Sequence, residues 1–130
     1  MTLSLPQRNS LLRLYPALLL LLATTAVQAE QDCTAPVTQT DMNICAFQDY
    51  QQADAKLNAA YRKLVATLDK DQLGRLKTAQ RAWITFRDAQ CRYEAGVYEG
   101  GSIAPLVHSS CLTNLTKQRT KDLIAQLDQP

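Results

Sequence analysis

Apolar residues recur at helical spacing through nearly the whole chain after residue 38, and this periodicity constrains the fold more than any other feature. Spacings of three and four residues place side chains on one face of an α-helix. Three such stripes occur, formed by Tyr50, Ala53, Leu57, Tyr61 or Ala60, Leu64 and Leu68; by Leu73, Leu76, Gln80, Trp83, Arg87 and Cys91; and by Leu112, Leu115, Arg119, Leu123 and Leu127. No segment shows the alternation of a strand. The sequence therefore predicts an all-α fold, an antiparallel three-helix array, with a short fourth helix at the N-terminus as the alternative.

Capping residues indicate where these helices begin. Thr38 with Asp41 has the pattern of a capping box, and Asp69 is a typical N-cap for the second helix. The segment GVYEGGSIAP interrupts the periodicity with three glycines and a proline, and Pro105 suits the first turn of a third helix. The connections near residues 69–71 and 96–105 are short, so neighbouring helices are expected to run antiparallel.

The first 29 residues have the pattern of an export signal. Arg8 and Arg13 supply a positive start, an apolar run covers residues 14–23 apart from Tyr15 and Pro16, and Val27-Gln-Ala29 offers a small-residue cleavage site. A run of about ten residues is short for a membrane span, which needs roughly 20. We expect cleavage after Ala29, a helical domain over 30–130, no remaining membrane anchor, and a periplasmic or secreted location.

Charge and cysteine spacing exclude several function classes. The signal holds two of the 14 basic residues and none of the 12 acidic ones, so 12 of each remain and the domain is formally neutral. Nucleic-acid binders carry a clustered basic surface, so no nucleic-acid partner is expected. The four cysteines contain no CxxC pair, which argues against a metal or haem site, and no cofactor is predicted. In a small exported chain, four cysteines favour two disulfides.

Antiparallel pairing gives a register. If the first connection centres near residue 70.5, then Asp54 and Arg87 are equidistant from it, and so are the pairs Asn58 with Trp83 and Tyr61 with Gln80. A second centre near Gly101 makes Cys91 face Cys111 and Trp83 face Arg119. We therefore predict a structural polar seam made of Asp54, Asn58, Tyr61, Gln80, Trp83, Arg87 and Arg119. Asp88 lies about 100 degrees from Arg87, at the edge of the seam or in solvent.

The same register predicts the disulfides. Cys91 and Cys111 are paired by their facing positions, whereas Cys33 and Cys45 are paired only because they are near in sequence. The alternative with the clearest consequence is a Cys45 to Cys91 bridge, which would change part of the helix layout.

As an ordered set, TQTDMNICA, ADAKLNAAY, QRAWITFRDAQC and GGSIAP, followed by a cysteine and TKQR, resemble the lysozyme-inhibitor LprI-type domain family. The resemblance covers Cys33 to about Leu127. It implies a small exported helical domain of bacterial envelopes, with lysozyme inhibition as the activity attached to the family. The founding type is lipid-anchored, but Glu30, Gln31 and Asp32 before Cys33 are unlike the small apolar residues of a lipidation site.

The residues themselves argue against catalysis. Hydrolysis needs a nucleophile beside a base or two carboxylates in a cleft, and the chain has one histidine, His108. Ser109 and Ser110 adjoin it, but neighbours one or two apart on a helix do not face each other. We therefore predict no catalytic residues.

A binding protein needs an exposed and braced feature, and the best candidate is the loop over residues 95–105. Its predicted partner-binding residues are Tyr98, Glu99, Gly100, Gly101 and Ser102, together with His108. Tyrosine gives contact area at low entropic cost, and glycine lets a partner approach the backbone. The alternative is that the glycines only form the turn and Tyr98 packs on the helices.

Two function classes follow. The first is a non-covalent inhibitor of lysozyme-type cell-wall hydrolases that occludes their active site; the partner is then a protein, lysozyme being the first choice. The second is an envelope structural, stress or immunity-type protein that binds another protein partner. Neither the partner nor an oligomeric state can be assigned from the residues alone.

Overall fold

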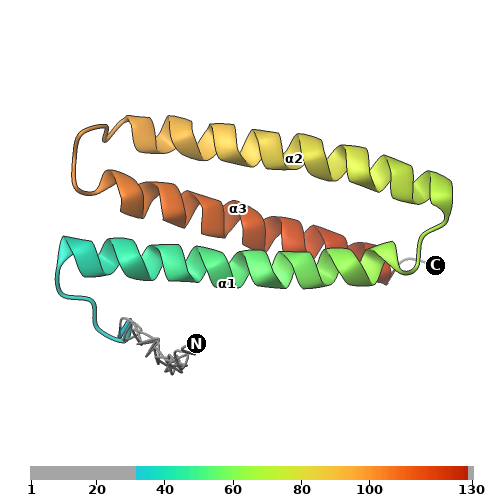
Figure 1. Ribbon diagram of the computed structural model, residues 1–130, viewed down its shortest axis with the longest axis horizontal. Helices are drawn as coiled ribbons and strands as arrows, with labels where there is room; N and C mark the ends of the chain where they lie inside the picture. Colours follow the sequence, from blue (N-terminus) through green and yellow to red (C-terminus); the bar gives the residue numbers. More distant parts are fainter. Residues whose placement is uncertain (1–31, 129–130) are drawn as a thin grey trace, which may run out of the picture.

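A computed structural model describes residues 32–128, so the predicted signal over residues 1–29 and its cleavage after Ala29 lie outside the described part. Three long helices follow in order, α1 (Gln39–Val65), α2 (Lys70–Gly96) and α3 (Ala104–Leu127). Between residues 32 and 128 there is no strand. Figure 1 shows that α2 runs back against the direction of α1, and that α3 reverses again to run parallel to α1. The predicted all-α, antiparallel three-helix array is confirmed.

The helix starts follow from local side-chain chemistry. Thr38 accepts from the backbone N–H of Asp41 at 3.1 Å, and the Asp41 carboxylate accepts from the Thr38 N–H at 3.0 Å. Asp69 and Gln72 make the same reciprocal pair at α2. These capping boxes satisfy backbone donors that a helix start otherwise leaves unpaired. Helix α3 has no side-chain cap; it begins at Ala104 with proline in its first turn, one residue before the predicted Pro105.

Helices α1 and α3 form the most extensive contact of the bundle, and α2 contacts α3 less. Small buried residues on both helices account for this close approach, since short side chains let backbones come together. On α1 they are Ala46, Ala53 and Ala60, which are spaced by seven residues and so share one face. On α3 they are Ser109, Thr113 and Thr116.

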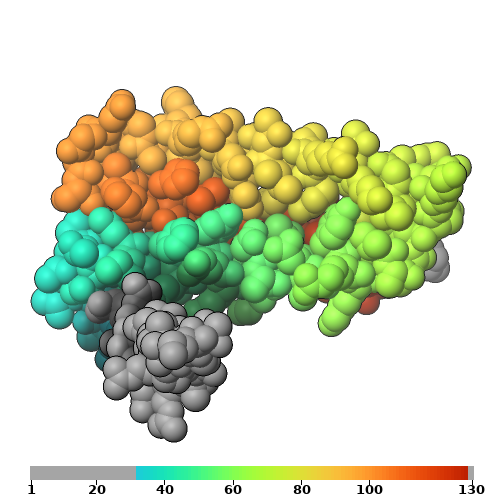
Figure 2. Space-filling model, viewed as in Figure 1, coloured from blue at the N-terminus to red at the C-terminus, as the bar shows by residue number. Residues whose placement is uncertain are grey.

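Larger side chains fill the space between α2 and the other two helices. One core cluster centres on Leu57, Leu64, Leu76 and Leu123, with Trp83 packed against it. A second cluster, near the connection between α2 and α3, joins Cys91, Cys111 and Leu112. In Figure 2, part of α3 (orange) is visible between α1 and α2 at that end. The bundle is therefore tightest at the α1–α3 contact and more open at α2.

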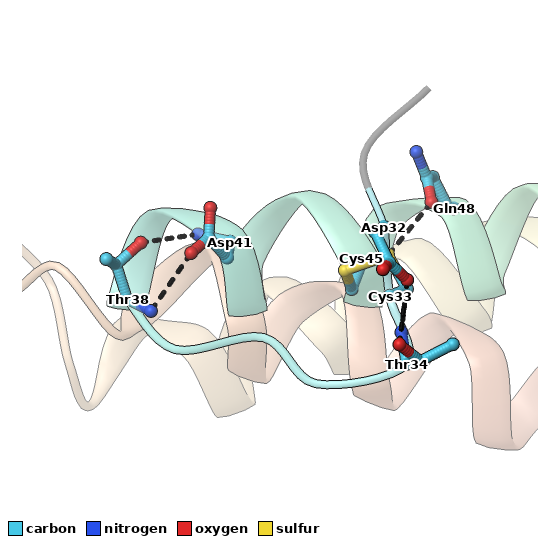
Figure 3. Close-up of a disulfide and its surroundings, with 7 residues drawn as sticks. All are labelled: Asp32, Cys33, Thr34, Thr38, Asp41, Cys45 and Gln48. Atoms are coloured by element: carbon cyan, nitrogen blue, oxygen red, sulfur yellow. Dashed lines mark hydrogen bonds between the residues drawn. A yellow bond between two sulfur atoms is a disulfide. The ribbon is translucent and has the colours of Figure 1, made fainter. Parts of the chain in front are cut away.

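Both predicted disulfides are present. Cys91–Cys111 joins α2 to α3 with its Cα atoms 5.5 Å apart, and Cys33–Cys45 ties the segment before α1 back onto that helix with the same Cα separation. Figure 3 shows the second bridge beside the Thr38–Asp41 capping box, with Gln48 next to Cys33. No cysteine of the described residues is free. The two bridges thus fix the loop end of the bundle and the entry into α1.

Candidate functional site

The predicted polar seam is built around Arg87, whose side chain is 8% exposed. Its Nη1 lies 3.5 Å from Oδ1 of Asp54 on α1, and its Nη2 lies 2.8 Å from Oδ1 of Asp88. The guanidinium also stacks near the rings of Trp83 and Tyr50, at 5.2 and 5.5 Å from their centroids. Burial raises the pKa of Tyr50, and the positive charge of Arg87 acts in the opposite direction. Arg87 therefore links α1 and α2 through both charge and stacking.

Trp83 continues the seam to α3. The guanidinium of Arg119 lies 5.9 Å from its ring centroid, and the Nε of Arg119 donates to Oε1 of Gln80 at 3.0 Å. Trp83 thus lies close to two guanidinium groups, one from its own helix and one from α3. The seam holds the three helices in register, because cation–π and charged hydrogen bonds require specific facing positions.

The structure places most of the register pairs as predicted. Asp54 meets Arg87, Cys91 meets Cys111 and Trp83 meets Arg119. The other two predicted pairs, Asn58 with Trp83 and Tyr61 with Gln80, do not form polar contacts with each other. Asn58 is exposed and donates to Asp54 on its own helix at 2.9 Å, and Gln80 binds Arg119 across to α3. Tyr61 packs on the leucine core instead of hydrogen bonding.

The loop between α2 and α3 is a series of tight turns. Tyr98 N–H donates to Ala95 O at 2.9 Å, and Gly101 N–H donates to Tyr98 O at 2.9 Å. Gly100 has a φ of 80 degrees, a conformation that residues with a Cβ rarely adopt. A Cβ added at Gly101 would lie 3.1 Å from Tyr98 O. The turn therefore needs glycine at Gly100, and a side chain at Gly101 would require Tyr98 O to shift slightly.

Two further interactions brace this loop. The Cys91–Cys111 disulfide closes its base, and Nδ2 of Asn43 on α1 donates to the Ser102 carbonyl at 3.0 Å. Asn43 was not singled out by the sequence, because a contact between residues 59 positions apart cannot be read from the two turns. The loop is consequently tied to all three helices.

The predicted loop residues differ in their exposure. Tyr98 is 45% exposed, and Glu99, Gly100, Gly101 and Ser102 are all exposed with it. His108 lies within the first turns of α3 and is half-buried, while Ser109 beside it is buried. The structure thus brings five of the six residues together in the loop and places His108 apart from it, on the helix.

Sequence reasoning missed an exposed stripe on α2. Phe86 and Tyr93 on α2, and Val97 as its C-cap residue, are 54%, 74% and 75% exposed. Their spacing of seven and four residues is helical, but the more marked pattern in this segment is the face that carries Trp83 and Cys91. This outer face of α2 is a second surface that the fold leaves uncovered.

The described residues offer little for other chemistry. Over residues 32–128 no cluster of three or more histidine, cysteine, aspartate or glutamate side chains could hold a metal ion. None of the three helices has a stretch both long and apolar enough to span a bilayer. The candidate site is the surface loop described above, on a small helical domain with two disulfides.

That class of domain agrees with the sequence comparisons. The lysozyme inhibitor LprI family model matches residues 29–123. An uncharacterized protein of Rhizobium meliloti strain 1021 is 46% identical over 125 residues, which cover 83% of this chain and 90% of the relative. The uncharacterized protein YecT of Escherichia coli strain K12 is 32% identical over 117 residues, 75% of this chain and 72% of the relative. No solved structure matches the chain. The chain belongs to the LprI lysozyme inhibitor family.

Membership of this family indicates a general function. The family is one of inhibitors rather than catalysts, which indicates a lysozyme-inhibitor-like protein that binds a protein partner. Two disulfides in so small a chain, together with the family, suggest an extracytoplasmic protein.

Proposed function

We propose that this protein is a periplasmic or secreted inhibitor of lysozyme-type cell-wall hydrolases, and that it occludes the enzyme's active site without a covalent step. The observation that carries the proposal is the braced loop between α2 and α3, which presents Tyr98 at the end of the bundle. Membership of a family of lysozyme inhibitors supports a lysozyme as the partner.

Rigidity supports the loop as the binding element. Its turn hydrogen bonds, the disulfide at its base and the Asn43 contact reduce the conformational freedom that binding would otherwise remove. A pre-ordered loop binds more tightly for the same contacts, because less entropy is lost on association. Tyr98 then supplies an aromatic anchor with few rotatable bonds.

The chemistry of the target fits as well. Lysozyme-type enzymes bind sugar chains in a cleft that carries two carboxyl groups. The loop offers exposed backbone at Gly100 and the Ser102 hydroxyl, and a backbone N–H or a hydroxyl can donate a hydrogen bond to such groups. Glu99 is expected at the rim of the contact, facing solvent.

The test is a titration of lysozyme activity with the wild-type protein, Tyr98→Ala and a Gly100→Ala/Gly101→Ala double variant. Loss of a central aromatic anchor typically costs about 2 kcal/mol, so Tyr98→Ala should inhibit roughly thirtyfold more weakly. The double variant should also lose inhibition, because Gly100 has a positive φ and a Cβ at Gly101 would crowd Tyr98 O.

Tyr93→Ala is the matched control, since Tyr93 is a more exposed tyrosine only five residues before Tyr98 but lies on α2. It should inhibit like the wild type. Each variant must first melt like the wild type. Equal inhibition by all variants would place the binding surface elsewhere, and failure of the wild type against several lysozyme classes would refute the inhibitor assignment.

A further inference from the structure

The outer face of α2 carries an apolar stripe that no part of the described chain covers. Phe86, Tyr93 and Val97 are all more than half exposed, at 54%, 74% and 75%. Steps of seven and eleven residues from Phe86 return to the same face of a helix, so the three side chains lie in one line. Large exposed apolar residues in a row mark interaction surfaces more often than isolated ones do.

In the first half of α2 the same face carries small side chains instead of large ones. Ala79 and Ala82 continue the line of Phe86 toward the start of α2, and both are small and exposed. Beside them lies an open hollow on the surface, lined by Lys70, Asp71, Gly74, Arg75, Thr78 and Ala79. Helix α2 therefore has a recessed half and a protruding half, which meet at Phe86.

We propose that this face of α2 binds the α2 helix of a second copy of the chain, in an antiparallel pair whose two-fold axis passes near Phe86. In such a pair, residues equally far before and after Phe86 face each other. Ala79 then faces Tyr93 of the other copy, seven positions from the axis on either side, and Ala82 faces Gln90 at four positions. On either side of the axis a small side chain of one copy thus meets a larger one of the other, while Phe86 meets Phe86 at the axis itself, and the hollow near Thr78 and Ala79 receives Tyr93.

Charge is consistent with this pairing. Arg75 is the charged residue in line with the stripe, and it faces Val97 at the end of the other copy's α2. The last turn of α2 contains no basic residue of its own, although its carbonyl groups carry partial negative charge. Arg75 of a second copy would supply that missing charge. The two Arg75 side chains lie at opposite ends of the seam, about 33 Å apart, so they do not repel each other strongly.

The pair leaves the loop between α2 and α3 at the two far ends, where Tyr98 remains accessible. Residues 98–102 stay outside the seam, so the dimer can be tested separately from the proposed inhibition. A seam one helix wide is small for a protein interface, so a reversible dimer in the micromolar range is expected rather than an obligate one.

The experiment is sedimentation equilibrium of the oxidised protein over a range of concentrations, with Phe86→Glu, Phe86→Lys and an equimolar mixture of both. Each single variant places two like charges at the axis and should weaken the dimer roughly a hundredfold. Because opposite charges then face each other, the mixture should form a heterodimer. Phe47→Glu on α1 is the matched control, since Phe47 is 50% exposed, and it should dimerise like the wild type.

A wild-type protein that stays monomeric up to millimolar concentration would overturn the proposal. So would a dimer that Phe86→Glu leaves intact, or one that Phe47→Glu disrupts equally. Recovery of the dimer only in the mixture of the two Phe86 variants would establish the two-fold position, because no other contact between copies brings residue 86 against itself.

Discussion

Arg87 has two carboxylate partners, and this changes what its mutation should reveal. The sequence register identified Asp54, on the facing helix, but the nearer partner is Asp88, at 2.8 Å. Helical-face reasoning treats adjacent residues as pointing apart, whereas a long arginine side chain can turn back toward its neighbour. Tyr50 was likewise assigned only to the apolar stripe of the first helix, although its ring centroid lies 5.5 Å from the guanidinium of Arg87. Facing positions could thus be read from the sequence, but the reach of a flexible side chain could not.

Removal of one carboxylate should therefore be mild. Asp54 and Asp88 have side chains that are 37% and 39% exposed, so Asp54→Ala or Asp88→Ala alone should destabilise by less than about 1 kcal/mol. The double variant leaves Arg87 buried without a counter-charge, and it should cost roughly 3 kcal/mol, more than the sum of the two. Urea melts of the four proteins measure this coupling. Strict additivity would show that Arg87 does not depend on the pair.

Asp41 gives a pH-dependent prediction at the same scale. Hydrogen bonds from Thr38, the backbone N–H first, lower the pKa of Asp41 below its ordinary value of 3.8. A lowered folded-state pKa means that the charged cap contributes stability above pH 3.8, and that this contribution is lost as the pH falls through the folded pKa. The stability difference between the wild type and Asp41→Asn should be constant near neutral pH and shrink in acid. Thermal melts over that range test it, and a difference independent of pH would contradict it.

At the scale of the elements, local patterns determined the helices well. Thr38 with Asp41 and Asp69 with Gln72 both form capping boxes, and the three periodic stripes correspond to α1, α2 and α3. The loop's position was also predicted, whereas the roles of Tyr98 and its neighbours in binding stay predictions. What local patterns did not reveal was the unequal spacing of the helices, because this depends on which small residues of α1 and α3 meet across the bundle.

Thr116 provides a test of that α1–α3 contact. It is fully buried, at 0% exposure, and its hydroxyl is without a hydrogen-bond partner among the described residues, whereas the Thr113 hydroxyl donates to Ser109 O at 2.9 Å. Thr116→Val keeps the shape and removes a buried unpaired polar group, so it should stabilise by about 1 kcal/mol. Thr113→Val is the control and should not stabilise, because it removes a satisfied donor. Denaturant melts decide, and stabilisation by both variants would show that hydroxyl pairing is not the cause.

At the scale of the whole molecule, the two disulfides should contribute differently to the free energy of unfolding, although the chain-entropy model assigns them nearly equal contributions. Their sequence separations are 12 and 20 residues, and for loops of this size the entropy model gives about 3 kcal/mol each. The difference lies in the folded state. Cys91 and Cys111 are 0% and 6% exposed and form the centre of a core cluster, whereas Cys33 is exposed and precedes α1.

Replacement of Cys91 and Cys111 by alanine should therefore cost the chain-entropy contribution plus a cavity term, roughly 4 to 5 kcal/mol in total. The matching Cys33→Ala/Cys45→Ala variant should cost at least about 1 kcal/mol less, because little packing is lost around Cys33. The first variant should also weaken lysozyme inhibition beyond its effect on folding, since the bridge braces the base of the proposed binding loop. Calorimetric melts and inhibition titrations of both proteins measure the two effects. Equal losses of stability would mean that loop closure alone explains both bridges, and unchanged inhibition by a folded Cys91→Ala/Cys111→Ala protein would show that the loop needs no brace.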